Sequence, residues 1–563
     1  MKNKSQQILL NILKASPKTY GQFLLLKKKY SGQAGLAPVS NATLIDAWRQ
    51  MKNHCSRQPG CRLRNEARSR LPKTDEKKIM TWLTKRPTRT LSGVTPLTVL
   101  TKPYPCPGQC IYCPNEPGMP KSYLSNEPAA QRAKFNNFNP VKQVKMRIKA
   151  LEANGHVVDK IELLILGGCF NAYPKKYQES FIKKCFDVCN SEWQGRSLPR
   201  QRNRQPGCRL QKIDESFKLN ESAKYRIIGI TIETRPDLIS PSEIKWLRKL
   251  GVTRVQLGVQ HLDDQILKLT RRGHATKQTI EATKLLKQAG FKIDYHLMPD
   301  LPGATPQKDL QMFKKIFADP GFKPDQIKIY PTVVNEFAPL AKWLKSNKYK
   351  PYSEKQLLDL LVKVKQLIPY YVRINRLIRD IPKESIMAGN KITNLRQYIS
   401  EQLKKQGKYC KCIRCREAKE DIADLKKAEL FTEKYRASEG WEYFISFENP
   451  KRDKLYSFIR LRFNDDRNNF LTELKDAAIV RELHTYGQLI PTVSRSRQPG
   501  WRVPKTAVQH TGFGKKLMKI AEDLFQKQGY KKIAVIAGIG VRPYYKKLGY
   551  SLQKTYMVKY LHH

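Results

Sequence analysis

Short β-like runs alternate with longer helical patterns between residues 91 and 378, and this alternation restricts the fold of the 563-residue chain more than any other feature. Seven runs rich in apolar and β-branched residues are predicted strands: VTPLTVL, KIELLILGG, RIIGITIE, RVQLGVQ, KIDYHLM, QIKIY and YYVRINRL. Helical patterns separate them, as in residues 240–251 and 276–291. Because helical crossovers join parallel strands, we expect an α/β fold, a partial or complete β/α barrel with its site at the carboxyl ends of the strands.

The C-terminal part, residues 421–563, follows a different pattern that predicts an α+β domain. Its predicted strands and single long helix are, in order, WEYFISFE, LYSFIRLRF, AAIVRELHTYG, GKKLMKIAEDLFQKQGY and KKIAVIAG. Residues 379–420, which contain CKCIRC, are predicted to form a linker between barrel and domain. Residues 1–90 are predicted to be a basic and mostly helical N-terminal region, since they hold 20 Lys or Arg but only 4 Asp or Glu.

The charge of the chain is strongly one-sided. Lys and Arg number 106 against 49 Asp and Glu, which gives a formal net charge of +57. Such a field attracts polyanions, nucleic acid first and anionic membrane second. We therefore interpret residues 1–90 as a region that contacts a polyanion; the alternatives are a solvated helical cap and a charge that serves solubility alone.

The sequence contains no apolar run of about 18 residues, and its first residues do not make a good secretory signal. Most of its 12 cysteines stand in short clusters that suit metal ligation better than a disulfide framework. Both features predict a cytoplasmic protein without a membrane partner.

Three cysteines follow the first predicted strand in CPGQCIYCP: Cys106, Cys110 and Cys113. Thiolates are the usual ligands of iron–sulfur clusters, and three of them leave one iron of a four-iron cluster open to an outside ligand. The alternative is an incomplete zinc site whose fourth ligand lies far away in the sequence.

Glycines or polar residues end several of the predicted strands. Gly167 and Gly168 end the second strand, where glycine allows a ligand to approach the backbone closely. Glu233 and Gln260 end later strands and would point at the same ligand. Each of them could instead be a barrel residue whose polar group is satisfied by the protein.

A glycine-rich segment precedes the long C-terminal helix. Gln509, Gly512 and Gly514 lead into it, and free N–H groups at a helix N-terminus suit a pyrophosphate. An aromatic pair, Tyr544 and Tyr545, follows the next strand. The strand in ELHTYG would offer its backbone to the amides of an extended ligand.

Cys410, Cys412 and Cys415 form a second thiolate cluster in the predicted linker. We interpret it as a zinc site without an evident fourth ligand, and the alternative is a redox-inert cysteine cluster.

Nearly identical Arg-Gln-Pro-Gly segments occur at residues 57–62, 204–209 and 497–502. Pro-Gly marks a turn, so we interpret them as surface loops inserted into otherwise complete domains. Cys61 and Cys208 would then belong to the insertions and not to a metal site.

Seven motifs of the barrel region together resemble the catalytic subunit of Elongator, a tRNA-modifying enzyme: CIYCPNEP, VDKIELLILGG, GITIETRPD, QLGVQH, YHLMPDLPG, KIYPT and RLIRDIP. That family joins a radical SAM barrel to a GCN5-related acetyltransferase domain, which ELHTYG, QHTGFGKKLM, KIAVIAGIGVRPYYKKLGY and YMVKYL resemble. The resemblance runs from about residue 75 to the C-terminus, apart from the two later insertions.

The resemblance implies ligands for the residues already singled out. The three cysteines after the first strand would hold a 4Fe-4S cluster with S-adenosylmethionine on its open iron, and Gly167 and Gly168 would contact the methionine amino group. The acetyl-CoA contacts would fall on a strand, a helix N-terminus and an aromatic residue: Glu482, Leu483, His484, Thr485, Gly512, Phe513, Gly514, Lys515, Lys516 and Tyr545. Lys160 would contact acetyl-CoA from the barrel side, and zinc would bind the second cysteine cluster.

The function implied is carboxymethylation of C5 of the tRNA wobble uridine. A 5′-deoxyadenosyl radical would take a hydrogen from the acetyl methyl of acetyl-CoA, and the carbon radical would add to C5 before thioester hydrolysis. The base would be splayed out of the anticodon loop, while the basic N-terminal region held the RNA backbone.

Two alternatives are a protein lysine acetyltransferase with the barrel as scaffold, and a non-catalytic RNA-binding protein. The presence of all three cluster cysteines disfavours the second. The sequence also departs from the family at Cys169, where threonine is usual, and at the third insertion, directly upstream of the pyrophosphate segment.

Overall fold

The computed structural model divides the chain into two compact units, Met1–Leu91 with Lys145–Val158, and Ser92–Val144 with Asp159–His563. The residues it describes are 2–57, 79, 82–84, 92–191, 212–418, 425–487 and 512–561. The three Arg-Gln-Pro-Gly segments, except for Arg57, lie outside the described residues, and so does Gln509. No helix in these described ranges is both long and apolar enough to cross a membrane.

The first unit contains the expected N-terminal helices, which are α1 (Lys2–Lys14), α2 (Tyr20–Gln33) and α3 (Asn41–Arg57). In α1 and α3 apolar residues recur at helical spacing and bury one face of the helix, whereas α2 buries Phe23 and Ser31 and leaves Leu24 and Leu25 exposed. The shared core includes Ile8, Leu9, Ile12, Phe23, Leu44, Ile45 and Leu83. Many of the lysines of this unit stay at its surface, as Lys14, Lys28 and Lys29 do.

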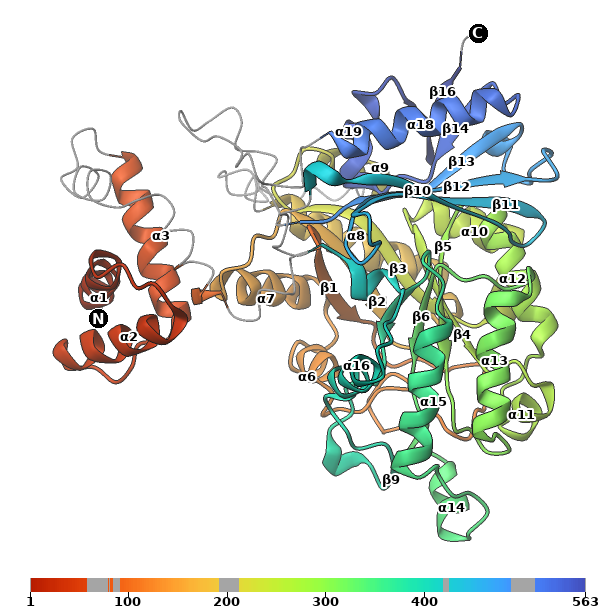
Figure 1. Ribbon diagram of the computed structural model, residues 1–563, viewed down its shortest axis with the longest axis horizontal. Coiled ribbons are helices and arrows are strands. Elements are labelled where there is room, and N and C mark those ends of the chain that lie inside the picture. The colour runs from red at the N-terminus through yellow and green to blue at the C-terminus, as the bar shows by residue number, and fades with distance from the viewer. Residues whose placement is uncertain are drawn as a thin grey trace, which may run out of the picture. The chain divides into compact units, whose positions relative to one another are not determined.

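A seven-stranded parallel sheet dominates the first half of the second unit (Figure 1). In sheet order its strands are β1 (Thr95–Leu100), β2 (Lys160–Leu166), β3 (Arg226–Thr234), β4 (Arg254–Gln260), β5 (Lys292–Leu297), β6 (Gln326–Ile329) and β8 (Arg373–Arg376). These are the seven predicted strands. Since no pairing joins β1 to β8 within the described part of the chain, the barrel is partial.

Burial explains why these segments are strands. In β2 the side chains of Ile161, Leu163 and Ile165 are buried while their neighbours are half-buried, and β4 is buried at every residue except its last. Helices alternate with the strands along the chain: α6 (Pro128–Phe135), α7 (Pro140–Ala153), α8 (Lys175–Ser191), α9 (Ile213–Asn220), α10 (Pro241–Lys249), α11 (Asp264–Leu269), α12 (Thr276–Gln288), α13 (Pro306–Ala318), α14 (Leu340–Lys345) and α15 (Glu354–Leu367). Ser240 and Thr305 cap α10 and α13 by accepting a backbone N–H.

The segment predicted to be a linker is folded. It contains α16 (Leu395–Lys405), which buries Leu395, Ile399 and Leu403, and the short α17 (Ile413–Arg416). It also supplies β9 (Ala388–Gly389), which pairs with β7 (Val333–Val334). Residues 379–418 therefore pack as an extension of the barrel rather than as an extended connection.

A second seven-stranded sheet follows, in the order β10-β11-β12-β13-β14-β16-β15. Its bounds are β10 (Glu429–Arg436), β11 (Gly440–Glu448), β12 (Leu455–Asn464), β13 (Ala477–Thr485), β14 (Lys532–Val535), β15 (Ser551–Gln553) and β16 (Tyr556–Tyr560). All pairs are antiparallel except β13 with β14. Helix α18 (Phe513–Lys527) packs on it through Leu517, Ala521 and Phe525, and α19 (Arg542–Lys546) follows β14.

A buried charge cluster joins the second sheet to the amino ends of the barrel strands. Arg481 of β13 donates to both carboxylate oxygens of Asp325, at 3.0 and 2.6 Å, and to Glu442 of β11 at 2.5 Å. All three side chains are fully buried. Each charge is paired and hydrogen-bonded, which is the condition under which ions persist in an interior.

Candidate functional site

The predicted cluster loop follows β1 and is held by backbone hydrogen bonds. The Ile111 N–H donates to the Thr270 carbonyl at 3.1 Å, and the Ile111 carbonyl accepts the Leu340 N–H at 2.8 Å. Cys110 is buried, whereas Cys106 and Cys113 are half-buried. The three thiols thus stand on a fixed loop at the carboxyl end of the first barrel strand.

Cationic and N–H groups surround these thiols. Arg272, which sequence reasoning missed, donates to the Cys110 sulfur at 3.6 Å and anchors itself on the Gly258 carbonyl. A hydrogen bond with Cys169, whose sulfur is 3.8 Å away, is the largest cause that lowers the pKa of Cys106 to about 6. Burial instead raises the pKa of Cys113 to about 12.

A four-iron cluster fits this loop better than a single ion does. One zinc ion, with Zn–S bonds of about 2.3 Å, would hold its sulfur ligands roughly 4 Å apart. Among the described residues, three sulfurs lie this close together, within 4.8 Å of one another, at Cys410, Cys412 and Cys415. The three thiols of the cluster loop do not form so compact a group, and the Arg272 guanidinium beside them balances the negative charge of a larger thiolate-bound cluster.

The predicted strand-end residues all lie at the same end of the barrel as the cluster loop. Gly167 has φ 130° and Gly168 has φ 89°, and a Cβ on Gly167 would lie 2.0 Å from the Thr101 hydroxyl oxygen, so only glycine fits there. Glu233 accepts a hydrogen bond from the Tyr123 hydroxyl at 2.7 Å.

Gln260 closes β4 in an unusual backbone conformation, with φ 70°. Its side-chain oxygen is buried and has no hydrogen-bond partner among the described residues. A buried acceptor without a partner marks a place where a ligand or water completes the site.

Lys160 lies at the opposite end of the barrel, because it is the first residue of β2 and Gly167 follows the last. Seven residues of strand span roughly 20 Å. Burial lowers the pKa of Lys160 below its ordinary value. The amino ends of the strands are the ends that contact the second sheet, as the 3.1 Å pair between Lys292 of β5 and Glu482 of β13 shows.

The predicted acetyl-CoA strand diverges from its neighbour. β13 pairs with β14 from Ala477 to Val480, whereas residues 482–485 pair only with β12 among the described residues. The register shifts at Arg460 and Leu461, which leaves Arg481 as an extra bulge residue in β13. Among the described residues no strand pairs with Glu482 to Thr485 on the side away from β12, so a ligand could bind their backbone groups there.

Side chains of that strand are engaged by the protein. Although burial acts to raise it, Lys292 and Arg460 lower the pKa of Glu482 to about 2. The His484 ring nitrogen donates to the Ser92 carbonyl at 3.0 Å, and burial lowers the pKa of His484 to about 4. The strand would therefore meet a ligand with backbone groups rather than with these two side chains.

The N-terminus of α18 lies beside this strand. Gly512 caps the helix with φ 92°, and Phe513 is buried under it. A Cβ on Gly514 would lie 3.9 Å from side-chain atoms of Leu483 and Thr485 and 3.2 Å from the Tyr544 hydroxyl. Lys515 and Lys516 are exposed on the first turn, where cations and free N–H groups together favour phosphate.

The two adjacent tyrosines of α19 have different surroundings. Tyr545, the predicted site residue, is buried in the hydrophobic core with Tyr550, whereas the Tyr544 hydroxyl is the one beside Gly514. Neighbours in sequence face different ways on a helix, so no sequence signal separates them.

The second cysteine cluster has the size of a single-ion site. The sulfurs of Cys410, Cys412 and Cys415 lie within 4.8 Å of one another, and no described His, Asp or Glu joins them. Hydrogen bonds from Cys410 and Cys412 lower the pKa of Cys415 to about 2, which favours its thiolate. Zinc stays a prediction for this group.

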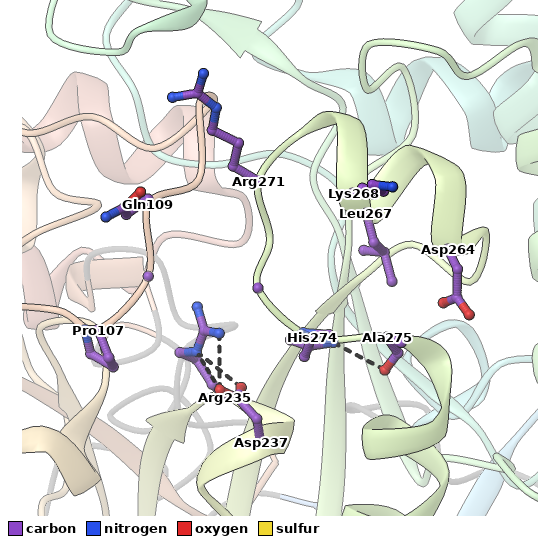
Figure 2. A pocket seen from close by; sticks show the side chains of 12 residues that line it. Pro107, Gln109, Arg235, Asp237, Asp264, Leu267, Lys268, Arg271, His274 and Ala275 are labelled. Atoms are coloured by element: carbon purple, nitrogen blue, oxygen red, sulfur yellow. Dashed lines mark hydrogen bonds and ion pairs between the residues drawn. The ribbon is translucent and has the colours of Figure 1, made fainter.

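A cavity of about 710 Å³ adjoins the cluster loop (Figure 2). Sequence reasoning did not anticipate it, because it forms where the segments after β1, β3 and β4 meet. It is lined by Pro107, Gly108, Gln109, Arg235, Asp237, Asp264, Leu267, Lys268, Arg271, Gly273, His274 and Ala275.

Comparisons with known proteins match both halves of this architecture. The Radical SAM superfamily model matches residues 104–316, and the Radical_SAM C-terminal domain model matches residues 324–405. The chain is 42% identical to a tRNA uridine(34) acetyltransferase of Methanocaldococcus jannaschii, over 86% of this chain and 88% of that protein. It is 36% identical to Elongator complex protein 3 of Homo sapiens, over 87% of this chain and 88% of that protein.

A solved structure shares most of this arrangement. The archaeal Methanocaldococcus infernus Elp3 with an N-terminal deletion is 38% identical and superposes with a TM-score of 0.69, covering 84% of this chain and 100% of that chain.

Proposed function

Because the chain belongs to the Elongator complex protein 3 family, we propose that it modifies the wobble uridine of tRNA by carboxymethylation at C5, with acetyl-CoA as the carbon donor. One observation carries the proposal. One compact unit contains both parts that the reaction needs. The first is a three-thiol loop at the carboxyl end of a radical SAM half-barrel, and the second is a diverging strand next to a glycine-capped helix.

In this proposal Cys106, Cys110 and Cys113 would hold a four-iron cluster and leave one iron open to S-adenosylmethionine. When bound and reduced, the cluster would supply one electron, which cleaves S-adenosylmethionine to methionine and a 5′-deoxyadenosyl radical. The chain orients the cofactor. Gly167 and Gly168 would allow its amino group close to the backbone, and the Gln260 oxygen, unpartnered among the described residues, would accept a hydrogen bond from it.

The acetyl-CoA would lie along β13 with its amides on the free backbone groups of residues 482–485. Its pyrophosphate would accept N–H groups at the start of α18, and Lys515 and Lys516 add positive charge there. Tyr544, beside Gly514, is a further candidate contact next to the predicted Tyr545. Lys160 would meet the ligand from the barrel side.

The substrate would be a single-stranded loop whose base is turned out of its stack, since the reacting groups lie inside a barrel. The basic first unit would hold the RNA backbone, and binding would weaken as salt rises because counterions compete for the phosphates. A cytoplasmic location and zinc at the second cysteine cluster belong to the same proposal.

The test is anaerobic reconstitution of the whole chain with iron and sulfide, followed by S-adenosylmethionine, acetyl-CoA and tRNA. Mass spectrometry of the digested tRNA should show 5-carboxymethyluridine. The Cys110→Ala variant should give none, and a product that persists in this variant would favour a function that does not need the cluster.

A protein lysine acetyltransferase is the second candidate, favoured by the diverging strand alone. It predicts acetyl transfer to lysine peptides without iron or tRNA. A tRNA product that depends on S-adenosylmethionine, with no peptide acetylation, would exclude it; a spectroscopically verified cluster without any tRNA product would overturn the main proposal.

A further inference from the structure

The cavity beside the cluster loop is separate from the expected cofactor site. One wall is the loop segment Pro107 to Gln109, between the first two cluster cysteines, and the opposite wall comes from residues 264–275 (Figure 2). None of the glycines or polar residues that end the barrel strands and are predicted to meet S-adenosylmethionine lines it. A partner in this cavity would therefore touch the loop that holds the cluster without touching those residues.

Arg235 supplies an unsatisfied positive group to this cavity. Its side chain is only 4% exposed, and two of its nitrogens donate to Asp237 at 2.9 to 3.2 Å. The third nitrogen, Nη1, is buried and has no hydrogen-bond partner in the described part of the chain. Gly108 makes room for it, because a Cβ there would lie 2.3 Å from Nη1. A buried donor without a protein partner marks a place that a small group such as a water or an ion completes.

Two more cations stand at the opening. Lys268, at the end of α11, and Arg271, three residues on, are both exposed, and neither makes an ion pair with another described residue. Gln109 and Pro107 of the cluster loop are exposed on the facing wall. The cavity thus has a buried guanidinium, paired with Asp237, at its floor and two free cations at its rim.

We propose that this cavity is the docking site of an acidic one-electron donor protein that reduces the cluster. The inference rests on the proposed function, since radical formation needs one electron per cleavage. The step is a pure electron transfer: the reduced donor loses one electron, the cluster gains it, and no bond or proton moves. Electron transfer slows steeply with distance, so a partner that touches the cluster loop has the shortest path.

The charges favour a protein over RNA. The carboxylate of Asp264 also lines the cavity and makes no ion pair with another described residue, so it would repel a continuous phosphodiester chain, whereas Asp237 is neutralised by Arg235. Spaced carboxylates of a protein surface can pair with Lys268 and Arg271 and avoid Asp264. Transient electron-transfer contacts are also small, which suits a single cavity with a short rim.

The experiment compares two ways of reducing the reconstituted cluster. Stopped-flow bleaching of the cluster absorbance is followed with a reduced, acidic plant-type ferredoxin and, separately, with dithionite. The pocket variant is K268E/R271E, and the matched control is K314E/K355E, which reverses two exposed lysines on α13 and α15. Affinity for tRNA is measured for each protein by filter binding.

We expect K268E/R271E to slow reduction by ferredoxin at least about tenfold at low salt, since opposite-charge steering contributes factors of 10 to 10³ to association. Reduction by dithionite and affinity for tRNA should match the control. Raising the salt from about 0.05 to 0.5 M should slow the wild-type reaction with ferredoxin and erase most of the difference.

Equal ferredoxin rates in the pocket and control variants would overturn the inference. A loss of tRNA affinity with unchanged ferredoxin reduction would also overturn it and assign the cavity to RNA. A wild-type chain that takes up no dithionite-reducible cluster would instead overturn the proposed function itself.

Discussion

Replacing Asp325 by asparagine should destabilise the unit that contains the barrel and the second sheet. The Asp325 carboxylate accepts two bonds from Arg481, at 3.0 and 2.6 Å, and one from the Ile293 N–H at 2.9 Å. Both charged side chains are fully buried. Asparagine keeps the size of the side chain, so the change removes charge without opening a cavity.

The expected cost follows from burial. Removing one partner of a buried, hydrogen-bonded ion pair costs about 3–5 kcal/mol, because the remaining charge stays desolvated. Asp465 offers a matched control, since it forms the same two-bond pair with Arg436 at 2.7 and 2.6 Å, but with both side chains 43% exposed. Asp465→Asn should therefore cost at most about 1 kcal/mol.

Equilibrium urea denaturation at pH 7, followed by circular dichroism on the whole chain, measures both free energies of unfolding. Burial acts to raise the pKa of Asp325, but Arg481 and Lys287 outweigh it and hold that pKa below the ordinary value. The stabilisation is thus present above the ordinary aspartate pKa of about 3.9 and is lost as the pH falls below it. Equal destabilisation by the two variants would refute the reasoning.

Three further predictions concern the other sites. Burial lowers the pKa of His484 to about 4, so between about pH 6.5 and 4 this histidine binds a proton in the unfolded chain but not in the folded one. The free energy of unfolding therefore falls as the pH falls through this range, and His484→Gln should remove up to about 1.4 kcal/mol per pH unit of that fall. An unchanged slope of stability against pH would contradict this. Gly512→Ala forces a side chain into φ 92°, should cost about 1 kcal/mol and should weaken coenzyme A binding in calorimetry while S-adenosylmethionine binding is kept. Plasma mass spectrometry should find zinc in the wild type and in Cys185→Ser, in α8, but not in Cys412→Ser; equal zinc in both variants would refute the site.

The barrel could be predicted from sequence because its strands are buried runs of apolar residues with regular helical spacers. β10 could not, since it is an edge strand whose side chains alternate between exposed and half-buried and include Glu429, Glu433 and Lys434. The helix α16 was missed because its apolar residues lie within a segment whose cysteines and glycine pointed to a linker.

The residues of the candidate site could likewise be predicted only in part. Cys106, Cys110 and Cys113 are close in sequence, so their spacing carried the prediction. Arg272 reaches Cys110 across 162 positions of sequence, and Arg235 meets Gly108 from another strand end; such meetings depend on tertiary packing, which no local pattern encodes.

Strand β2 also sets the distance between the two ends of the barrel. Its first residue, Lys160, stands at the end of the barrel that meets β13, and its last is followed by the glycines at the cluster end. Under the proposed function, the length of this strand would set the distance from β13, which would bind the carrier of the acyl group, to the radical. Under the proposed function, the reach of the carrier arm, more than the chemistry of its nucleotide head, would decide which thioesters react. When the pantetheine arm of the acetyl thioester is shortened step by step, the yield of carboxymethylated tRNA should then fall abruptly at one length. A gradual fall would refute the idea that the strand length sets the required reach.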